Sequence, residues 1–132
     1  GDFEEGFSEW DANVYSRITD DSYSGESAAL LSNGSARLYQ SFPETIQAGQ
    51  TINVAFHCKR LGRFSGMKFS IRNTSGAAFR HDTVMDCSEG YWTENRFSIP
   101  VNVTTDLEVW TFAPSSSSSY STIIDNIIVT VN

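Results

Sequence analysis

Hydrophobic and polar residues alternate along several stretches of the chain, as they do in a β-strand with one buried face. The clearest case is 51–59, where every second residue is apolar: Ile52, Val54, Phe56 and Cys58. The residues between them, His57 included, then point to the opposite face. The same alternation occurs at 68–72 and 106–112, and the run from 122 to 131 is rich in β-branched residues. These four stretches predict four strands.

Further strands are predicted near 13–18, 27–31, 36–42, 77–85 and 91–99, because turn-forming residues separate these stretches. No segment repeats apolar residues at helical spacing over three turns. Nine or ten strands at intervals of roughly ten residues indicate an all-β fold, an antiparallel β-sandwich of the jelly-roll type. The 132 residues are enough for one sizeable core, so we expect residues 1–132 to form a single domain.

Composition and charge argue against nucleic acid and membrane as partners. Only 9 basic residues stand against 16 acidic ones, giving a net charge of -7, and no stretch gathers lysine and arginine into a patch. We therefore expect no nucleic-acid partner. No apolar run approaches the ~20 residues that a membrane helix needs, so we expect no membrane partner either. The opening Gly1-Asp2-Phe3 has the character of a domain boundary, which suggests a module cut from a larger protein.

The two cysteines, Cys58 and Cys87, leave two interpretations open. They form one disulfide bridge, or they are two buried free thiols. Disulfides persist in oxidising compartments, so an extracellular or secreted protein favours the bridge.

Catalytic patterns are weak. His57 is next to Cys58, but neighbours on a strand point to opposite faces, so the two form no dyad. His81 is the only other histidine, and the pair lacks the spacing of a zinc site. A glycosidase needs two carboxylates, which any two of the 16 could supply. We nevertheless expect a non-catalytic domain.

Asp125 lies inside an apolar strand, where an unpaired charge is unfavourable by several kcal/mol. Backbone hydrogen bonds or a basic neighbour would neutralise it. The other candidate is bound Ca²⁺, a hard cation that takes six to eight oxygen ligands from carboxylates and carbonyls.

Several short motifs occur in a characteristic order: Gly-Asp-Phe-Glu at 1–4, Trp10, Tyr23-Ser24-Gly25, Gln40, Ala48-Gly49-Gln50 and Ile124-Asp125-Asn126. In this order and spacing the chain resembles, over essentially its whole length, the carbohydrate-binding modules grouped as families four, nine and twenty-two. The resemblance implies a jelly-roll sandwich with a structural Ca²⁺ and no catalysis. It also implies calcium ligands from the opening motif, the Ser-Gly turn and the closing motif: Glu4, Gly25, Ser27 and Asp125, with Asp2 as a further ligand. The family often has two acidic residues near the end, where this chain has Asp125-Asn126.

The supply of aromatic residues supports sugar binding. There are 3 Trp, 5 Tyr and 9 Phe. Pyranose rings stack their C–H faces on aromatic rings, while amide, guanidinium and imidazole groups bond to hydroxyls. Trp110 is out of phase with Leu107 and Val109, so its indole should point away from the core, unless it belongs to a second small core. The predicted ligand-binding residues are Tyr15, Tyr39, Gln40, His57, Arg72 and Trp110. The family resemblance implies that Trp10 and Trp92 are structural, in the core or at the hinge of the sandwich.

These features predict a module that binds polysaccharide or oligosaccharide and targets an appended polysaccharide-degrading catalytic domain to plant or algal polysaccharide. Glucan or xylan is the first choice of ligand. The outward Lys59 and Arg72 keep an acidic polysaccharide as the second. The alternative is a structural or adhesive spacer domain of a surface protein or phage tail without a sugar cleft. We expect a monomer. Strand phase does not reveal which sheet carries the cleft.

Overall fold

The structure is a computed structural model that describes residues 3–4, 10–12, 16–31, 36–42, 44–61, 66–74, 79–112 and 121–132. These residues contain the following strands: β1 (Asp11–Ala12), β2 (Ser16–Thr19), β3 (Ala28–Leu31), β4 (Arg37–Ser41), β5 (Thr51–Arg60), β6 (Gly66–Arg72), β7 (Arg80–Asp86), β8 (Thr93–Pro100), β9 (Glu108–Phe112) and β10 (Thr122–Val131). Among the described residues, none forms a helix long and apolar enough to cross a membrane.

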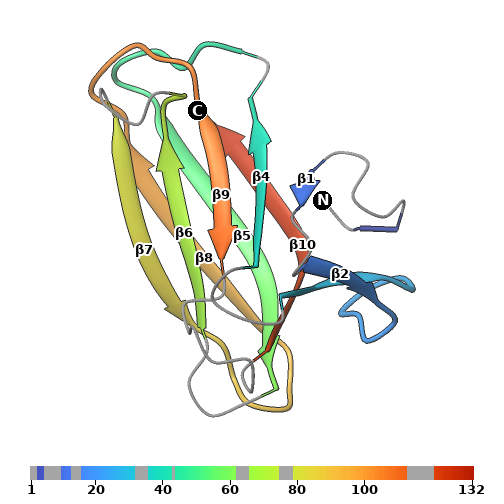
Figure 1. Ribbon diagram of the computed structural model, residues 1–132. Coiled ribbons are helices and arrows are strands. Elements are labelled where there is room, and N and C mark those ends of the chain that lie inside the picture. The colour runs from blue at the N-terminus through green and yellow to red at the C-terminus, as the bar shows by residue number, and fades with distance from the viewer. Residues whose placement is uncertain are drawn as a thin grey trace.

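The strands form two five-stranded antiparallel sheets. The first, here called the β9 sheet, has the order β1-β4-β9-β6-β7, and the second, the β10 sheet, has the order β2-β3-β10-β5-β8. Figure 1 shows the sheets as two layers, with the C-terminus at the end of β10. The prediction of an antiparallel all-β sandwich is therefore confirmed.

The alternation in the sequence accounts for most strands. In β5 every second residue is buried from Ile52 to Cys58, and the residues between are half-buried. The two-residue strand β1 was not predicted, because it is too short to show alternation. Of the strand predicted at 13–18, only the part from Ser16 lies in the described residues, and it belongs to β2.

The core lies between the sheets and is filled by the inward residues of both. Phe56 from β5 packs on Phe69 from β6, with ring centroids 4.6 Å apart. A disulfide joins Cys58 of β5 to Cys87, which directly follows β7, and so links the two sheets. The bridge predicted from the sequence is confirmed, and the interpretation as two free thiols was wrong.

The expected positions of two tryptophans have different outcomes. Trp10 is 7% exposed and belongs to the core, as predicted. Trp92 is half-buried and lies on the outer face of the β10 sheet, where it contacts Tyr23 and Lys59. Its assignment to the core was wrong, because it precedes β8 in register with the outward Lys59 rather than with Cys58.

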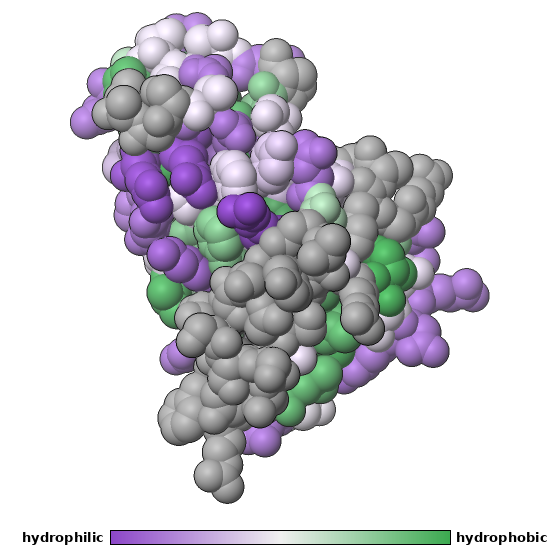
Figure 2. All heavy atoms as spheres, viewed as in Figure 1, coloured by the Kyte–Doolittle hydropathy of each residue, from purple (hydrophilic) through white to green (hydrophobic). Residues whose placement is uncertain are grey.

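On the side of the molecule shown in Figure 2, hydrophilic residues cover much of the described surface. Hydrophobic residues form separate areas between them. This side of the described surface therefore has no single continuous hydrophobic area.

Candidate functional site

Outward residues of the β9 sheet form rows that cross the strands, because paired residues on neighbouring strands point to the same face. The central row runs from β1 to β7: Asp11, Tyr39, Trp110, Ser70 and Asp82. The row on one side contains Arg37, Phe112, Lys68 and Val84, and the row on the other contains Ser41, Glu108, Arg72 and Arg80. The face thus carries aromatic rings among polar and charged groups.

Trp110 stands between two partners. Its indole stacks on the ring of Tyr39, with centroids 4.3 Å apart and planes 12° apart. The guanidinium carbon of Arg72 lies 4.3 Å from the indole centroid. Since β4 and β6 flank β9 on opposite sides, Tyr39 and Arg72 approach the indole from opposite sides. A ligand therefore meets the exposed edge of this stack and not a bare indole face.

The aromatic surface continues along β9. The ring of Phe112 lies 6.0 Å from that of Trp110 at 15°. Two cations flank these rings: Arg37 lies 5.9 Å from the Trp110 centroid and Lys68 lies 6.0 Å from the Phe112 centroid. We call the group of Tyr39, Trp110, Phe112, Arg37, Lys68 and Arg72 the aromatic strip. It combines ring surface for C–H groups with donors for hydroxyl or carboxylate oxygens.

Neighbouring charges and burial shift the pKa values of two groups in the strip. A hydrogen bond to Asp11, together with the negative charge of that carboxylate, raises the pKa of the Tyr39 phenol. Burial lowers the pKa of Arg72, and the positive charge of Arg80 acts in the same direction. The Nε1 of Trp110 and the Nε of Arg72 are buried and have no hydrogen-bond partner among the described residues.

Three of the predicted ligand-binding residues, Tyr39, Arg72 and Trp110, meet on this face. Gln40 does not join them: it pairs with the buried Val109 and so points to the opposite side of β4 from Tyr39. Its prediction was wrong, since neighbours on a strand cannot share a face. His57 was predicted for the same site but lies on the β10 sheet, where it stacks on Tyr23. Tyr15 lies outside the described residues.

Arg37, Lys68 and Phe112 belong to this face although they were not among the predicted binding residues. Strand alternation indicates that they lie on this face, because Arg37 is two residues before Tyr39 and Phe112 is two residues after Trp110. Lys68 shares its face with Arg72, four residues later.

A second group of polar residues surrounds the turn Tyr23–Ser27. The backbone amides of Glu26 and Ser27 donate to the Glu4 carboxylate at 2.9 and 3.1 Å. The amides of Tyr23 and Ser24 donate to Asp125 Oδ2 at 3.0 and 3.2 Å. Asp125 is fully buried. The turn is therefore held between carboxylates from the start and the end of the chain.

Gly25 makes this arrangement possible. Its φ of 68° lies in the left-handed region, which favours glycine. A Cβ at this position would also collide with Glu4 Oε1. A side chain at residue 25 would therefore displace the Glu4 carboxylate from the turn.

The predicted calcium ligands Glu4, Gly25, Ser27 and Asp125 thus lie around one turn, whereas Asp2 lies outside the described residues. Burial raises the pKa of Asp125 despite three backbone hydrogen bonds, and the negative charge of Glu4 adds to the rise. A divalent cation would relieve this repulsion. Within the described part of the chain no three His, Cys, Asp or Glu residues converge, so Ca²⁺ would draw most of its oxygens from carbonyls. The turn directs four backbone amides at the two carboxylates, so its carbonyl oxygens would have to complete the ligand set of an ion bound here.

No protein-family model matches the chain, and no curated protein matches its sequence. Solved structures show the fold. A family 16 carbohydrate-binding module is similar with a TM-score of 0.78 at 17% identity, over 98% of this chain and 96% of that one. A second similar structure contains the CBM22-1 and GH10 modules of endo-1,4-beta-D-xylanase 10B from Clostridium thermocellum, complexed with xylohexaose. Its TM-score is 0.73 at 18% identity, over 98% of this chain and 27% of that one.

A third similar structure is the enzymatically active domain of tailspike protein 4 from bacteriophage CBA120, with a TM-score of 0.73 at 16% identity, covering 97% of this chain and 20% of that one. At these identities the similarity establishes the jelly-roll sandwich that carbohydrate-binding modules also have. The ligand is inferred from the residues of the site.

Proposed function

We propose that this chain is a non-catalytic carbohydrate-binding module that binds polysaccharide across the outer face of the β9 sheet. The observation that carries the proposal is the aromatic strip. Its rings offer apolar surface to sugar C–H groups, and its cations and polar neighbours offer hydrogen bonds to hydroxyls. The strip is spread over strands β4, β9 and β6, which suits an extended polymer better than a small enclosed ligand.

Xylan is the first ligand proposed. A similar fold belongs to modules of a xylanase complexed with xylohexaose, which supports a xylan-type backbone. The three cations of the strip, Arg37, Lys68 and Arg72, support a polysaccharide with acidic groups as the second choice. Glucan belongs to the same first choice of ligand. Contacts between aromatic rings and sugar C–H groups depend on the pyranose ring and not on a single substituent of it.

The module would act by keeping an appended polysaccharide-degrading enzyme at its substrate, which raises the local substrate concentration. The tandem of a module with a GH10 domain in the xylanase supports this arrangement. Such a protein works outside the cell, and the disulfide between Cys58 and Cys87 agrees with an oxidising compartment. Cys58 is thereby also unavailable as a nucleophile.

A structural Ca²⁺ at the turn Tyr23–Ser27 is part of the proposal. Glu4 and Asp125 would supply carboxylate oxygens, and the turn would supply carbonyl oxygens. The ion would tie the first residues of the chain to β10. It would stabilise the fold and would not contact a sugar on the aromatic strip, because Asp125 pairs with His57 on the other sheet.

Affinity electrophoresis against soluble xylan, mixed-linkage glucan and alginate tests the function. The wild type should be retarded by xylan, and Tyr39→Ala should be retarded less because the stack loses one ring. Release of reducing ends from the same polysaccharides should be absent. Retardation by none of the panel would favour the alternative, a structural or adhesive spacer domain without a sugar cleft. Reducing-end release would instead indicate an enzyme.

A further inference from the structure

The outer face of the β10 sheet carries a second set of groups suited to sugar. Its outward residues follow β5 and β8 in paired positions: Asn53 with Ser98, Ala55 with Arg96, and His57 with Glu94. Lys59 continues this side of β5, where its Nζ lies 5.4 Å from the Trp92 ring centroid. The positions from Asn53 to His57 span about 13 Å along the strand, which is longer than one pyranose ring.

One end of this face is aromatic. Tyr23 stacks on the imidazole of His57, with centroids 3.6 Å apart and planes 10° apart. Trp92 meets Tyr23 edge-on at 6.1 Å. Tyr23 is 49% exposed, although its backbone amide is fixed by Asp125. The ring is therefore both accessible and held in one place, which lowers the entropy lost on binding.

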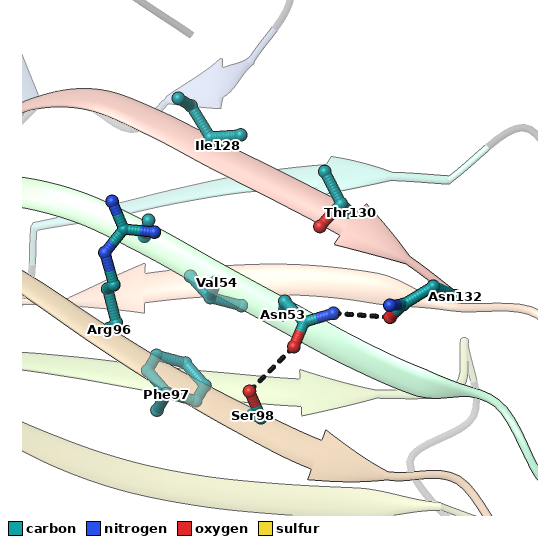
Figure 3. A pocket seen from close by; sticks show the side chains of 9 residues that line it. Asn53, Val54, Arg96, Phe97, Ser98, Ile128, Thr130 and Asn132 are labelled. Atoms are coloured by element: carbon teal, nitrogen blue, oxygen red, sulfur yellow. Dashed lines mark hydrogen bonds between the residues drawn. The ribbon is translucent and has the colours of Figure 1, made fainter.

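The other end is a hollow of about 470 Å³ over Ala55 and Asn53. Figure 3 shows hydrogen bonds running across it from Ser98 through Asn53 to Asn132. Both of these bonds are 2.7 Å long, so the amide and hydroxyl groups are preorganised. Ile128, which is 50% exposed, adds an apolar wall beside them.

The hollow exists because residue 55 is small. Ala55 lies between Ile128 of β10 and Arg96 of β8, both of which have longer side chains. The hollow and the aromatic end are adjacent, since His57 follows Ala55 on the same side of β5. An aromatic ring, an apolar wall and a row of amides and hydroxyls thus form one continuous surface.

The charges on this surface are paired with one another. Lys59 binds Asp21 at 2.6 Å. Arg96 forms an ion pair with Glu94, whose other oxygen lies 3.7 Å from His57 Nε2. A charged ligand would have to compete with these pairs, whereas a neutral one can accept or donate hydrogen bonds beside them. This differs from the cation-rich aromatic strip on the other sheet.

We propose that the outer face of the β10 sheet, from Tyr23 and Trp92 to Asn53 and Ser98, is a second carbohydrate-binding site that takes a neutral oligosaccharide. It shares its ligand class with the proposed function but not its residues. The module then binds sugar on both faces of the sandwich. Two sites on opposite faces would crosslink neighbouring polymer chains or raise avidity for a fibre.

The tryptophan indole N–H signals in a nitrogen–proton NMR spectrum report the two faces separately. Trp110 reports the β9 sheet, Trp92 the β10 sheet, and the buried Trp10 serves as the internal reference. Xylohexaose, cellohexaose and laminarihexaose are titrated separately into the whole chain. We expect the Trp92 and Trp110 signals both to move with at least one of these sugars, along different saturation curves, while Trp10 stays fixed.

Variants assign the movements to the two sites. Ala55→Phe fills the hollow, and it should reduce the Trp92 shift at least fivefold without affecting Trp110. Asn102→Phe places the same ring on an exposed loop position and should change neither signal. In Trp110→Ala the Trp92 shift should persist. Salt at 0.5 M should leave the Trp92 curve unchanged, because the ligand is neutral.

The outcomes separate the two proposals. Movement of Trp110 alone with all three sugars, or a Trp92 shift that Ala55→Phe leaves intact, would overturn the second site and leave the proposed function standing. Movement of Trp92 alone would support the second site and remove the aromatic strip as a binding face for xylan and glucan. If neither signal moves with any sugar, the second site fails, and so does the assignment of xylan or glucan to the strip.

Discussion

Replacing Trp110 by alanine removes the middle ring of the stack formed with Tyr39 and Arg72 on the outer face of the β9 sheet. A ligand contacts the exposed edge of this stack, so the contact made by Trp110 itself lies at the lower end of the roughly 1–3 kcal/mol that bases gain on protein aromatics. Arg72 and Tyr39 also lose the group that orients them. The affinity for the best oligosaccharide on this face should therefore fall roughly tenfold to a hundredfold.

The control is the neighbouring Val109→Ala. Val109 is 1% exposed and faces the core, so the variant loses two buried carbons and leaves a cavity. The expected destabilisation is about 2–3 kcal/mol. For a chain of this length that corresponds to roughly 10 °C in melting temperature. Trp110 is only half-buried and lies outside the core, so Trp110→Ala should melt much closer to the wild type.

Calorimetric titration and thermal melting of both variants check the reasoning. Val109→Ala should bind like the wild type at a temperature where it is folded, and Trp110→Ala should bind weakly while melting nearly normally. If Trp110→Ala melts lower than Val109→Ala and binds unchanged, the stack is a structural element and the binding face must be sought elsewhere.

Three further predictions concern the turn and the strip. Excess chelator should lower the melting temperature, because an ion bound only to the folded state stabilises it by mass action; an unchanged melt, with no metal in elemental analysis, would contradict the Ca²⁺. Gly25→Ala should melt lower than Gly49→Ala: both glycines have positive φ, but only the Cβ at 25 meets Glu4, and equal melts would show that the contact is unimportant. Asp11→Ala should lower the pKa of Tyr39 toward its ordinary value of about 10, as measured by phenolate absorbance with Tyr39→Phe as the blank. Because the folded-state pKa is raised, the stability from this bond is complete below pH ~10 and disappears as the pH rises through the folded-state value; an unaltered titration would exclude the bond.

Strand phase explains how much of the fold was predictable. In β5 and β9 the sequence alternates cleanly, so the outward direction of His57 and Trp110 followed from their neighbours alone. Phase tells inward from outward but not which of two sheets a strand joins. This is why His57 was grouped with Trp110 although β5 and β9 lie in different sheets.

The remaining errors have local causes. Gln40 was selected for its chemistry although it adjoins Tyr39 on β4 and must face the other way. Trp92 has the same phase as the outward Glu94 and Arg96 of β8, so alternation alone would have placed it on the outer face; the family resemblance placed it in the core instead. The hollow over Ala55 forms because this small residue lies between the larger Ile128 and Arg96 on the neighbouring strands. The sequence alone does not give the register that brings these three residues together.

The most direct test of the proposed function is a glycan array probed with the wild-type chain. The array should contain plant and algal polysaccharides together with defined oligosaccharides of xylan, glucan and alginate type. Binding should occur to a group of glycans that share one backbone, with xylan-type structures first. Binding to no glycan on the array would contradict a carbohydrate-binding module.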